Sequence, residues 1–309
     1  MTETCDARLQ LPVPSTINLV ATLGALRKSG RDPSTALRPD GFWLAARLPP
    51  GPATVRLFRS DPNTVQAEAW GPGAAELLLR VPGLVGLLDD VRDFQPTLPL
   101  LRRLHAQAAG FRFARTGLML RAAVATILGQ KVTTVEASRA WGLLLTQVGE
   151  AAPGPLPLRL MPERRLLVRL PGHVWTRFGV HRAQAATISR VVALGPTLDA
   201  MLDLTPAGMV ERLQKVRGIG PWTANAVARD AAGWADAVPE GDYHVKNTIA
   251  WALAGKARGS DVDMLALLEP HRPHRGRVVR LIESAGIHAP RFGPKSDVRP
   301  LPGSDWTTR

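Results

Sequence analysis

Two short stretches of the chain hold residues whose types and spacing could perform chemistry. The first, residues 213–224, reads Leu-Gln-Lys-Val-Arg-Gly-Ile-Gly-Pro-Trp-Thr-Ala, which indicates a helix, a turn built on Gly218 and Gly220, and a second helix. Glycines adopt turn conformations that other residues resist, and Pro221 suits the first turn of a helix. A helix start presents unpaired N–H groups and the positive end of the helix dipole. We therefore predict that this hairpin binds phosphate.

The second stretch places one carboxylate, Asp242, 22 residues after Gly220. An aspartate before the helix predicted from Tyr243 can simply be its cap, which is the commoner role. The same geometry can serve chemistry, because a carboxylate at a helix start can stabilise a developing oxocarbenium ion or orient a water at a sugar carbon. Asp236 and Glu240 are the alternative acids. A phosphate-binding turn followed by one acid indicates an enzyme that acts on DNA.

Residues around the hairpin strengthen this interpretation. Lys215 and Arg217 place positive charge beside the turn, and the Thr223 hydroxyl can bond a phosphate or the local backbone. A Gly-x-Gly turn alone is weak evidence, since most such turns only connect elements. No strand-like segment precedes it, which argues against a dinucleotide-binding fold, and no Gly-Lys-Ser/Thr follows, which excludes a nucleotide-phosphate loop.

The net charge of +13 belongs entirely to the C-terminal two-thirds of the chain. Residues 1–100 contain 10 basic and 10 acidic residues, so residues 101–309 hold the other 29 basic and 16 acidic residues. The asymmetry indicates a polyanionic partner for the C-terminal part, although an arginine-rich solvated surface would produce the same count.

Composition also limits the setting of the protein. A single cysteine, Cys5, excludes disulfides within the chain, cysteine-rich zinc sites and four-cysteine iron–sulfur clusters. No run of 18 or more apolar residues occurs, so no membrane partner is expected. The acidic first six residues lack the basic and apolar regions of a signal peptide. We therefore expect a reducing, cytoplasmic setting.

The pattern of the chain changes after about residue 100. Strands are predicted at residues 41–47, 53–58 and 64–70, with flanking helices at 17–26 and 74–80. Helical spacing then predicts helices at 118–128, 135–148, 182–194, 206–216, 222–232, 243–254 and 275–284. Thr205 and Pro206 are a helix start signal, and the Pro- and Gly-rich residues 151–157 predict a surface connection.

This pattern predicts a small α+β domain, residues 1–100, and an all-α domain, residues 101–288, in a chain that is mainly α. The polar, Pro-rich residues 289–309 predict a disordered tail.

Two motifs together resemble the helix-hairpin-helix DNA glycosylase superfamily. They are residues 216–224 with 238–243, and Phe111-Arg112 with residues 125–132, in the superfamily's order. Within it the chain is similar to the bacterial 3-methyladenine DNA glycosylase II family, which repairs alkylated DNA. The resemblance implies a TATA-binding-protein-like N-terminal domain and a helical glycosylase domain. It also implies a nucleoid-associated bacterial protein that acts on double-stranded DNA containing alkylated bases.

The resemblance assigns roles to residues that match the motifs. Asp242 matches the catalytic aspartate, and Trp222 and Tyr243 match the base pocket. The residues implied to contact DNA lie on the hairpin and on the loop at its side: Gly218, Gly220, Thr223, Lys215, Arg217, Gln130 and Lys131. Backbone carbonyls match those that hold a structural Na⁺ or K⁺ ion, and they belong to Gln214, Val216 and Ile219. No cofactor is implied to be required.

Position 222 bears on mechanism. Relatives that cleave the DNA strand have a lysine there, which forms a Schiff base with C1′. Trp222 therefore implies a monofunctional enzyme that uses water and leaves an abasic site. Its electron-rich ring also suits a cationic alkylated base, an attraction of roughly 0.5–2 kcal/mol, although core packing is the competing interpretation.

The sequence departs from the family at several positions. Gln130 and Lys131 match residues that are inserted into the duplex when a base is flipped out. A relative can have leucine where Lys131 stands, so Lys131 is expected at a phosphate and Gln130 or Val132 in the gap. Ala226, Arg280 and Leu281 stand where a relative can have an aromatic residue, which bears on the range of substrates.

A basic group near the C-terminal end offers a further expectation of DNA contact. Its members are His271, Arg272, His274, Arg275 and Arg277. The two histidines alone make a weak metal site, because no cysteine or acid stands at ligand spacing.

These observations predict a monomeric, monofunctional DNA glycosylase that flips out alkylated purines and hydrolyses their glycosidic bond. Two alternatives stay open: a weakly active or inactive helix-hairpin-helix DNA-binding protein, and a glycosylase for a different purine lesion.

Overall fold

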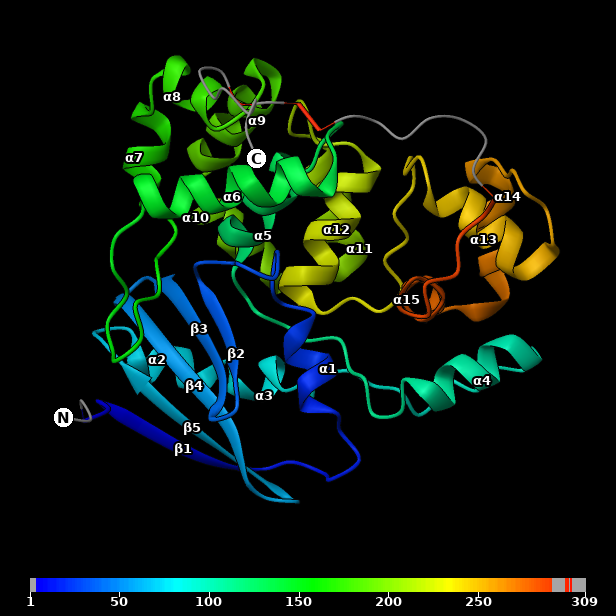
Figure 1. The fold of residues 1–309 in the computed structure, drawn as a ribbon, viewed down its shortest axis with the longest axis horizontal. Coiled ribbons are helices and arrows are strands. Elements are labelled where there is room, and N and C mark those ends of the chain that lie inside the picture. The colour runs from blue at the N-terminus through cyan, green and yellow to red at the C-terminus, as the bar shows by residue number, and fades with distance from the viewer. Residues whose placement is uncertain (1–3, 291–297, 300, 302–309) are drawn as a thin grey trace, which may run out of the picture.

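A five-stranded antiparallel sheet forms the N-terminal part of the protein (Figure 1). The computed structural model describes residues 4–290, 298–299 and 301. The strands lie in the order β1-β5-β4-β3-β2. Their bounds are β1 Ala7–Pro12, β2 Thr35–Arg38, β3 Gly41–Leu48, β4 Gly51–Asp61 and β5 Thr64–Trp70.

Both faces of the sheet are covered near its centre, which explains why β3 is buried almost throughout. Leu44 and Val55 face a core closed by α2 (Ala74–Leu79) and α3 (Val81–Leu84). Trp43 and Trp70 face the other way and pack with Leu158 and Leu160. Alternate residues of a strand point to opposite faces, so a doubly covered strand is apolar on both.

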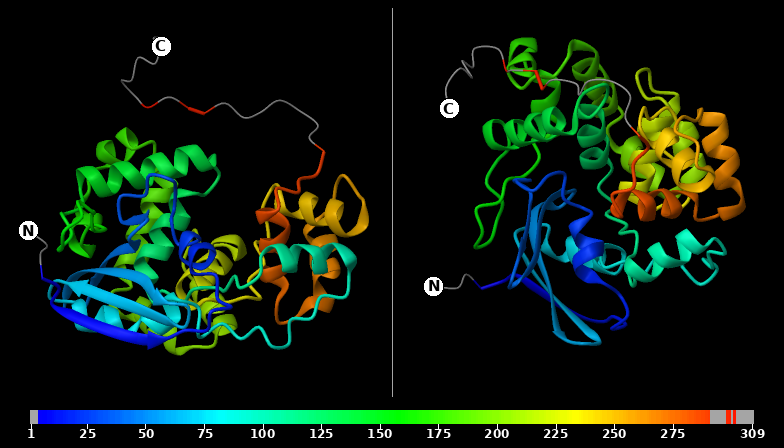
Figure 2. Two further views of the ribbon diagram at one scale, coloured as in Figure 1. Left: turned by 60° about the horizontal axis from the view of Figure 1, so that its bottom comes forward. Right: turned by 45° about the vertical axis from the view of Figure 1, so that its right-hand side comes forward.

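The described chain after the sheet is mainly helical, and the right-hand view of Figure 2 shows the green to orange helices above and to the right of the blue sheet. Helix α1 (Leu19–Gly24) lies between β1 and β2 in the chain, and α4 (Pro99–Gln107) follows α3. Eight helices form a central group in which α5 (Met119–Leu128) is buried. The other seven are α6 Thr134–Gln147, α7 Arg164–Arg169, α8 Gly172–Arg177, α9 Arg182–Ala193, α10 Pro196–Asp199, α11 Pro206–Gln214 and α12 Pro221–Ala232. A separate core joins α4 to α13 Val245–Ala254, α14 Asp261–Leu268 and α15 Arg275–Ser284. Two short 3₁₀ segments, Ala200–Asp203 and Glu269–His271, complete the set.

The three strands and the longer helices predicted from the sequence are confirmed within a few residues. Thr205 caps α11 by accepting a hydrogen bond from the Gly208 N–H, and Pro206 is its first residue. The two edge strands, β1 and β2, were not predicted, and neither were helices α3, α4, α7, α8, α10 and α14. The connection at residues 151–157 holds no helix, but it packs on the sheet, since Pro153 and Gly154 lie against Gly71 and Trp70.

The predicted tail, residues 289–309, falls mostly outside the described residues, which include only 289–290, 298–299 and 301 of it. Arg299 lies against α6, where its N–H donates to Glu136 Oε1 at 3.1 Å and its carbonyl accepts from Arg139 Nη2 at 2.7 Å. In the part of the chain that the structure describes, no helix has both the length and the apolar character needed to cross a bilayer.

A buried carboxylate, Asp32, joins the N-terminal part to the central helices. It accepts hydrogen bonds from Arg121 Nη2 of α5 at 3.1 Å and from Trp141 Nε1 of α6 at 2.8 Å. The Asp32 and Arg121 side chains are almost fully buried. Burial alone would raise the pKa of Asp32, but the Arg121 guanidinium and the hydrogen bonds from Lys28, Trp141 and Ser34 outweigh it and hold the pKa below its ordinary value.

We predict that Asp32→Asn lowers the free energy of unfolding at pH 7 by about 3–5 kcal/mol, because Arg121 is left buried without a counter-charge. Urea unfolding measures this change. An aspartate whose pKa is lower in the folded chain adds stability that is present above the unfolded-state pKa, about 3.9, and is lost as the pH falls through the folded-state pKa. The difference between the two proteins should therefore shrink below about pH 4.

Asp199→Asn is the matched control, because Asp199 pairs with Arg164 at 2.6 Å on the surface. An exposed pair contributes less than about 1 kcal/mol. Equal losses in the two variants would contradict the role assigned to Asp32.

Candidate active site

The hairpin between α11 and α12 depends on one glycine more than on the other. Gly218 has a φ of +96°, and a Cβ there would lie 2.2 Å from Thr187 Oγ1 of α9, so only glycine fits. Gly220 has a φ of −95° and a ψ of −179°, an extended conformation that any residue adopts. The prediction that both glycines are needed for the turn is therefore wrong for Gly220.

Gly220 instead leaves open space at the start of α12. A Cβ there would meet no atom within 4 Å, and the residue is exposed. Pro221 follows as the first residue of the helix, so the free N–H groups of the first turn face an uncovered approach. This is the arrangement in which a helix start binds an anion.

Cations gather beside this helix start. Lys215 and Arg217 are exposed, as predicted, and Arg190 of α9 lies with them because its Nη1 donates to the Arg217 carbonyl at 3.1 Å. The sequence analysis missed Arg190, which is 27 residues away along the chain. Its position in the last turn of a predicted helix was the only available signal.

Gln130 is attached to the hairpin. Its Nε2 donates to the Gly218 carbonyl and to Thr223 Oγ1, each at 2.9 Å. Thr223 is 2% exposed, so its hydroxyl serves this internal contact rather than a phosphate. Gln130 therefore couples the loop after α5 to the start of α12.

The loop after α5 is bonded to Gln184 of α9, a residue that was not predicted from the sequence. Gln184 of α9 is buried, and its Nε2 donates to the carbonyls of Ile127, Leu128 and Gln130 at 3.0–3.2 Å. These bonds close the exposed carbonyl end of α5. Gln184 also accepts from the His181 N–H at 2.8 Å, and its place three residues after His181 at a helix start was a readable signal.

Lys131 follows in a strained conformation at the tip of this loop. Its φ of +56° is the only positive φ of a non-glycine residue in the described chain, and its side chain is exposed. Such conformations cost about 1–3 kcal/mol and gather at functional sites. The loop thus projects Lys131 outward while Gln130 turns inward to the hairpin.

The acid and the indole meet where α12 and α13 begin. Trp222 Nε1 donates to Asp242 Oδ2 at 3.0 Å, and the N–H groups of His244 and Val245 donate to Asp242 Oδ1 at 2.8 and 3.0 Å. Both side chains are half-buried. Asp242 is thus the helix cap and, at the same time, a carboxylate fixed by three donors with one oxygen turned toward α12.

Neither of the alternative acids, Asp236 and Glu240, is hydrogen-bonded to Trp222 as Asp242 is. Asp236 is buried and accepts two bonds from Arg275, at 3.0 and 2.7 Å, so it serves an internal ion pair. Glu240 is half-buried beside Asp242 on the same loop. Tyr243, predicted to line a base pocket, is 76% exposed and contacts the His244 ring.

Most of the basic group near the C-terminal end is internal, which corrects the expectation of DNA contact for its buried members, whereas Arg272 is exposed and pairs with Glu269 at 2.7 Å. Arg277 is 2% exposed, and its Nη2 lies 2.6 Å from Asp89 Oδ1. His274 and Arg275 are buried as well. Of the other positions where relatives can have aromatics, Ala226 and Leu281 are buried, while Arg280 stacks its guanidinium 5.8 Å from the centroid of the Phe111 ring.

The hairpin carbonyls keep some capacity for a monovalent cation. The Val216 carbonyl accepts from the Ile219 N–H at 2.9 Å, which uses one of its two lone pairs. Among the described residues no donor reaches the carbonyls of Gln214 or Ile219. The carbonyls of Gln214 and Ile219 and one lone pair of Val216 are therefore left unused by the described chain. The described residues contain no group of three or more His, Cys, Asp or Glu side chains able to hold a metal.

No family model matches the chain. It is 28% identical over 272 residues to the "probable bifunctional transcriptional activator/DNA repair enzyme AlkA" of Mycobacterium tuberculosis, a match that covers 84% of this chain. The match covers 52% of the relative, so the chain spans about half of its length.

Solved structures share the fold. A 3-methyladenine DNA glycosylase from Archaeoglobus fulgidus superposes with a TM-score of 0.75 at 16% identity, covering 89% of this chain and 97% of that one. An 8-oxoguanine glycosylase/lyase from Clostridium acetobutylicum superposes with a TM-score of 0.67 at 13% identity, covering 92% and 98%. The resemblance predicted from the hairpin and Asp242 is therefore confirmed: the chain has the fold of the helix-hairpin-helix DNA glycosylases.

Proposed function

We propose that this protein is a monofunctional DNA glycosylase that hydrolyses the bond between deoxyribose and an alkylated purine. The observation that carries the proposal is the contact of Trp222 with Asp242 beside an open, cation-flanked helix start. Through Trp222, it joins an anchor for a DNA phosphate at the start of α12 to a fixed carboxylate in the loop before α13. The likeness to glycosylases for alkylated and oxidised purines supports the same reaction class.

The hairpin would hold the DNA backbone. A phosphate oxygen would accept hydrogen bonds from the first N–H groups of α12, and Lys215, Arg217 and Arg190 would add positive charge. Lys131, at the exposed loop tip, would contact the duplex nearby. A monovalent cation, if one binds to the carbonyls of Gln214, Val216 and Ile219, would add charge at the same phosphate.

One carboxylate is enough for this chemistry when the base is alkylated. An alkylated purine carries a positive charge, so the C1′–N bond breaks with its electron pair going to the base, which departs neutral and needs no added proton. The positive charge that develops on the sugar faces Asp242, which stabilises it electrostatically. Water then adds to C1′ and passes its proton to Asp242, which releases it to solvent, and an abasic site remains.

Trp222 has two parts in this proposal. Its N–H holds Asp242 Oδ2, which fixes the direction of the carboxylate. Its half-buried ring can attract a cationic base by roughly 0.5–2 kcal/mol. Since position 222 is not lysine, no Schiff base to the DNA is expected there.

Oxidised purines are the second candidate substrate, because an 8-oxoguanine glycosylase/lyase shares the fold over 92% of this chain. In addition, Arg280 stands over Phe111 at a position where relatives can have an aromatic residue, which bears on the range of substrates. Excision measured on duplexes that carry 3-methyladenine, 7-methylguanine or 8-oxoguanine would rank these substrates.

We predict that Asp242→Asn lowers the single-turnover rate of 3-methyladenine release from duplex DNA at least about 100-fold, because the developing sugar charge loses its counter-charge. The amide keeps the size of the side chain. Asp203→Asn, an exposed aspartate outside the site, should retain the wild-type rate. A wild-type rate in Asp242→Asn would contradict the assignment of Asp242 as the catalytic acid group. Trapping of a covalent DNA adduct by borohydride would contradict the monofunctional mechanism.

We also predict that Trp222→Phe lowers the same rate about tenfold, since one hydrogen bond to a charged group is lost while the ring stays. Affinity for a duplex with an abasic site should not change, because the helix start is intact. Trp251→Phe, at a partly exposed tryptophan of α13, is the control. Loss of rate and of DNA affinity together would indicate general disruption rather than positioning of Asp242.

A further inference from the structure

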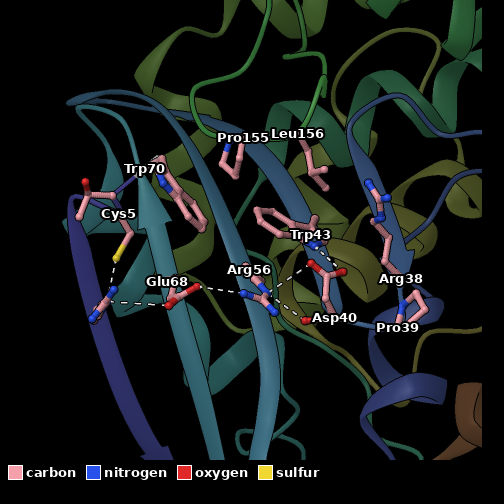
Figure 3. Close-up of a pocket in the computed structure, with 12 residues that line it drawn as sticks. Cys5, Arg38, Pro39, Asp40, Trp43, Arg56, Glu68, Trp70, Pro155 and Leu156 are labelled. Carbon is pink, nitrogen blue, oxygen red and sulfur yellow. Dashed lines mark hydrogen bonds and ion pairs between the residues drawn. The ribbon is translucent and has the colours of Figure 1, made fainter. Parts of the chain in front are cut away.

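A cavity of about 600 Å³ lies on the sheet, far along the chain from the hairpin. Figure 3 shows its two walls, with Trp70, Trp43, Pro155 and Leu156 on one side and a row of charged side chains on the other. Its volume falls within the range of small-molecule sites, roughly 300–1,000 Å³. Nothing in the proposed reaction uses it.

The apolar wall is rigid. The Trp43 and Trp70 rings stack with centroids 5.3 Å apart and planes at 23°, and both residues are buried. The loop at residues 151–157 lies on this pair, since a Cβ on Gly154 would be 3.1 Å from the Trp70 ring. Leu156 is half-buried at the cavity edge. A ligand would therefore meet mainly Pro155 and Leu156, with the stacked tryptophans packed behind them.

The polar wall contains one more cation than it has acids. Glu68 lies 3.8 Å from Arg8 Nε and 3.3 Å from Arg56 Nη1, and Asp40 Oδ2 lies 3.7 Å from Arg56 Nε. Arg56 also donates to the Asp40 carbonyl at 2.9 Å. The two acids are thus satisfied by Arg56 and Arg8.

Arg38 is the surplus charge. It ends the edge strand β2 and is exposed, and no side-chain hydrogen bond or ion pair joins it to any residue that the structure describes. Three arginines against two acids leave one net positive charge in the lining. An arginine beside an apolar surface is suited to a sulfonate, carboxylate or phosphate group.

We propose that this cavity binds a small organic anion with a flat apolar body and one acidic group. The body lies against Leu156 and the edges of the stacked tryptophans, and the acidic group pairs with Arg38. The site is separate from Asp242 and does not depend on the proposed glycosylase function.

Two fluorescent probes of similar shape test the proposal on the full chain. Anilinonaphthalene sulfonate carries one acidic group, and phenylnaphthylamine has a similar apolar body without it. Arg38→Gln should weaken the sulfonate's affinity about tenfold and change that of phenylnaphthylamine less than about twofold, because only the charge-assisted bond is lost. Leu156→Asp should weaken both probes, since it removes apolar surface that both contact.

Arg102→Gln is the matched control. Arg102 is likewise an exposed arginine, on α4, outside the cavity lining, so this variant loses the same charge and should bind both probes as the wild type does. Equal weakening of the sulfonate by Arg38→Gln and Arg102→Gln would overturn the proposal. Loss of probe binding in Trp222→Phe, with no effect of Leu156→Asp, would also overturn it by placing the probe beside Asp242.

Discussion

The carboxylate of Asp242 is shared between two helices, and the site depends on that sharing. Its Oδ1 caps α13, and its Oδ2 is held by the indole of α12. A carboxylate bonded only to its own helix would turn with that helix. The second contact fixes the acid relative to the start of α12, where the phosphate is expected to bind. The distance between anchor and acid is thus set by one helical turn rather than by a flexible loop.

The start of α12 is in turn positioned by polar contacts from α5 and α9. Gln130 bonds the hairpin at Gly218 and Thr223, and Gln184 bonds the loop that carries Gln130. Thr187 fills the space beside Gly218 that any side chain would need. The hairpin is therefore held on its inner side by buried groups, while its outer side stays open at Gly220. Buried, fully bonded polar groups of this kind favour one arrangement, because each unpaired member would cost about 1–3 kcal/mol.

Local patterns in the sequence predicted much of this, and tertiary contacts account for the rest. The longer helices and the three central strands were readable because their apolar residues repeat with a clear period. The edge strand β1 alternates half-buried and exposed residues and ends at Pro12, so its apolar signal is weak. At the site, the hairpin and Asp242 form a local motif. Thr187 and Arg190 reach the hairpin only through the packing of α9, and the spacing of the sequence does not show which other segment this helix packs against.

The wrong expectation for Arg275 and Arg277 shows what charge counting omits. Arg277 and Arg275 are matched by Asp89 and Asp236, which lie 188 and 39 residues away in sequence. Residues 271–277 contain basic side chains and no acid, so the local sequence does not show these distant partners. Lys215, Arg217 and Lys131 have no acid within ion-pair distance among the described residues. The charge available to a polyanion is the charge that the fold leaves unpaired, and around the start of α12 it lies beside free N–H groups. Arg38 obeys the same rule on a different face, where the neighbouring surface is apolar and the expected anion is small.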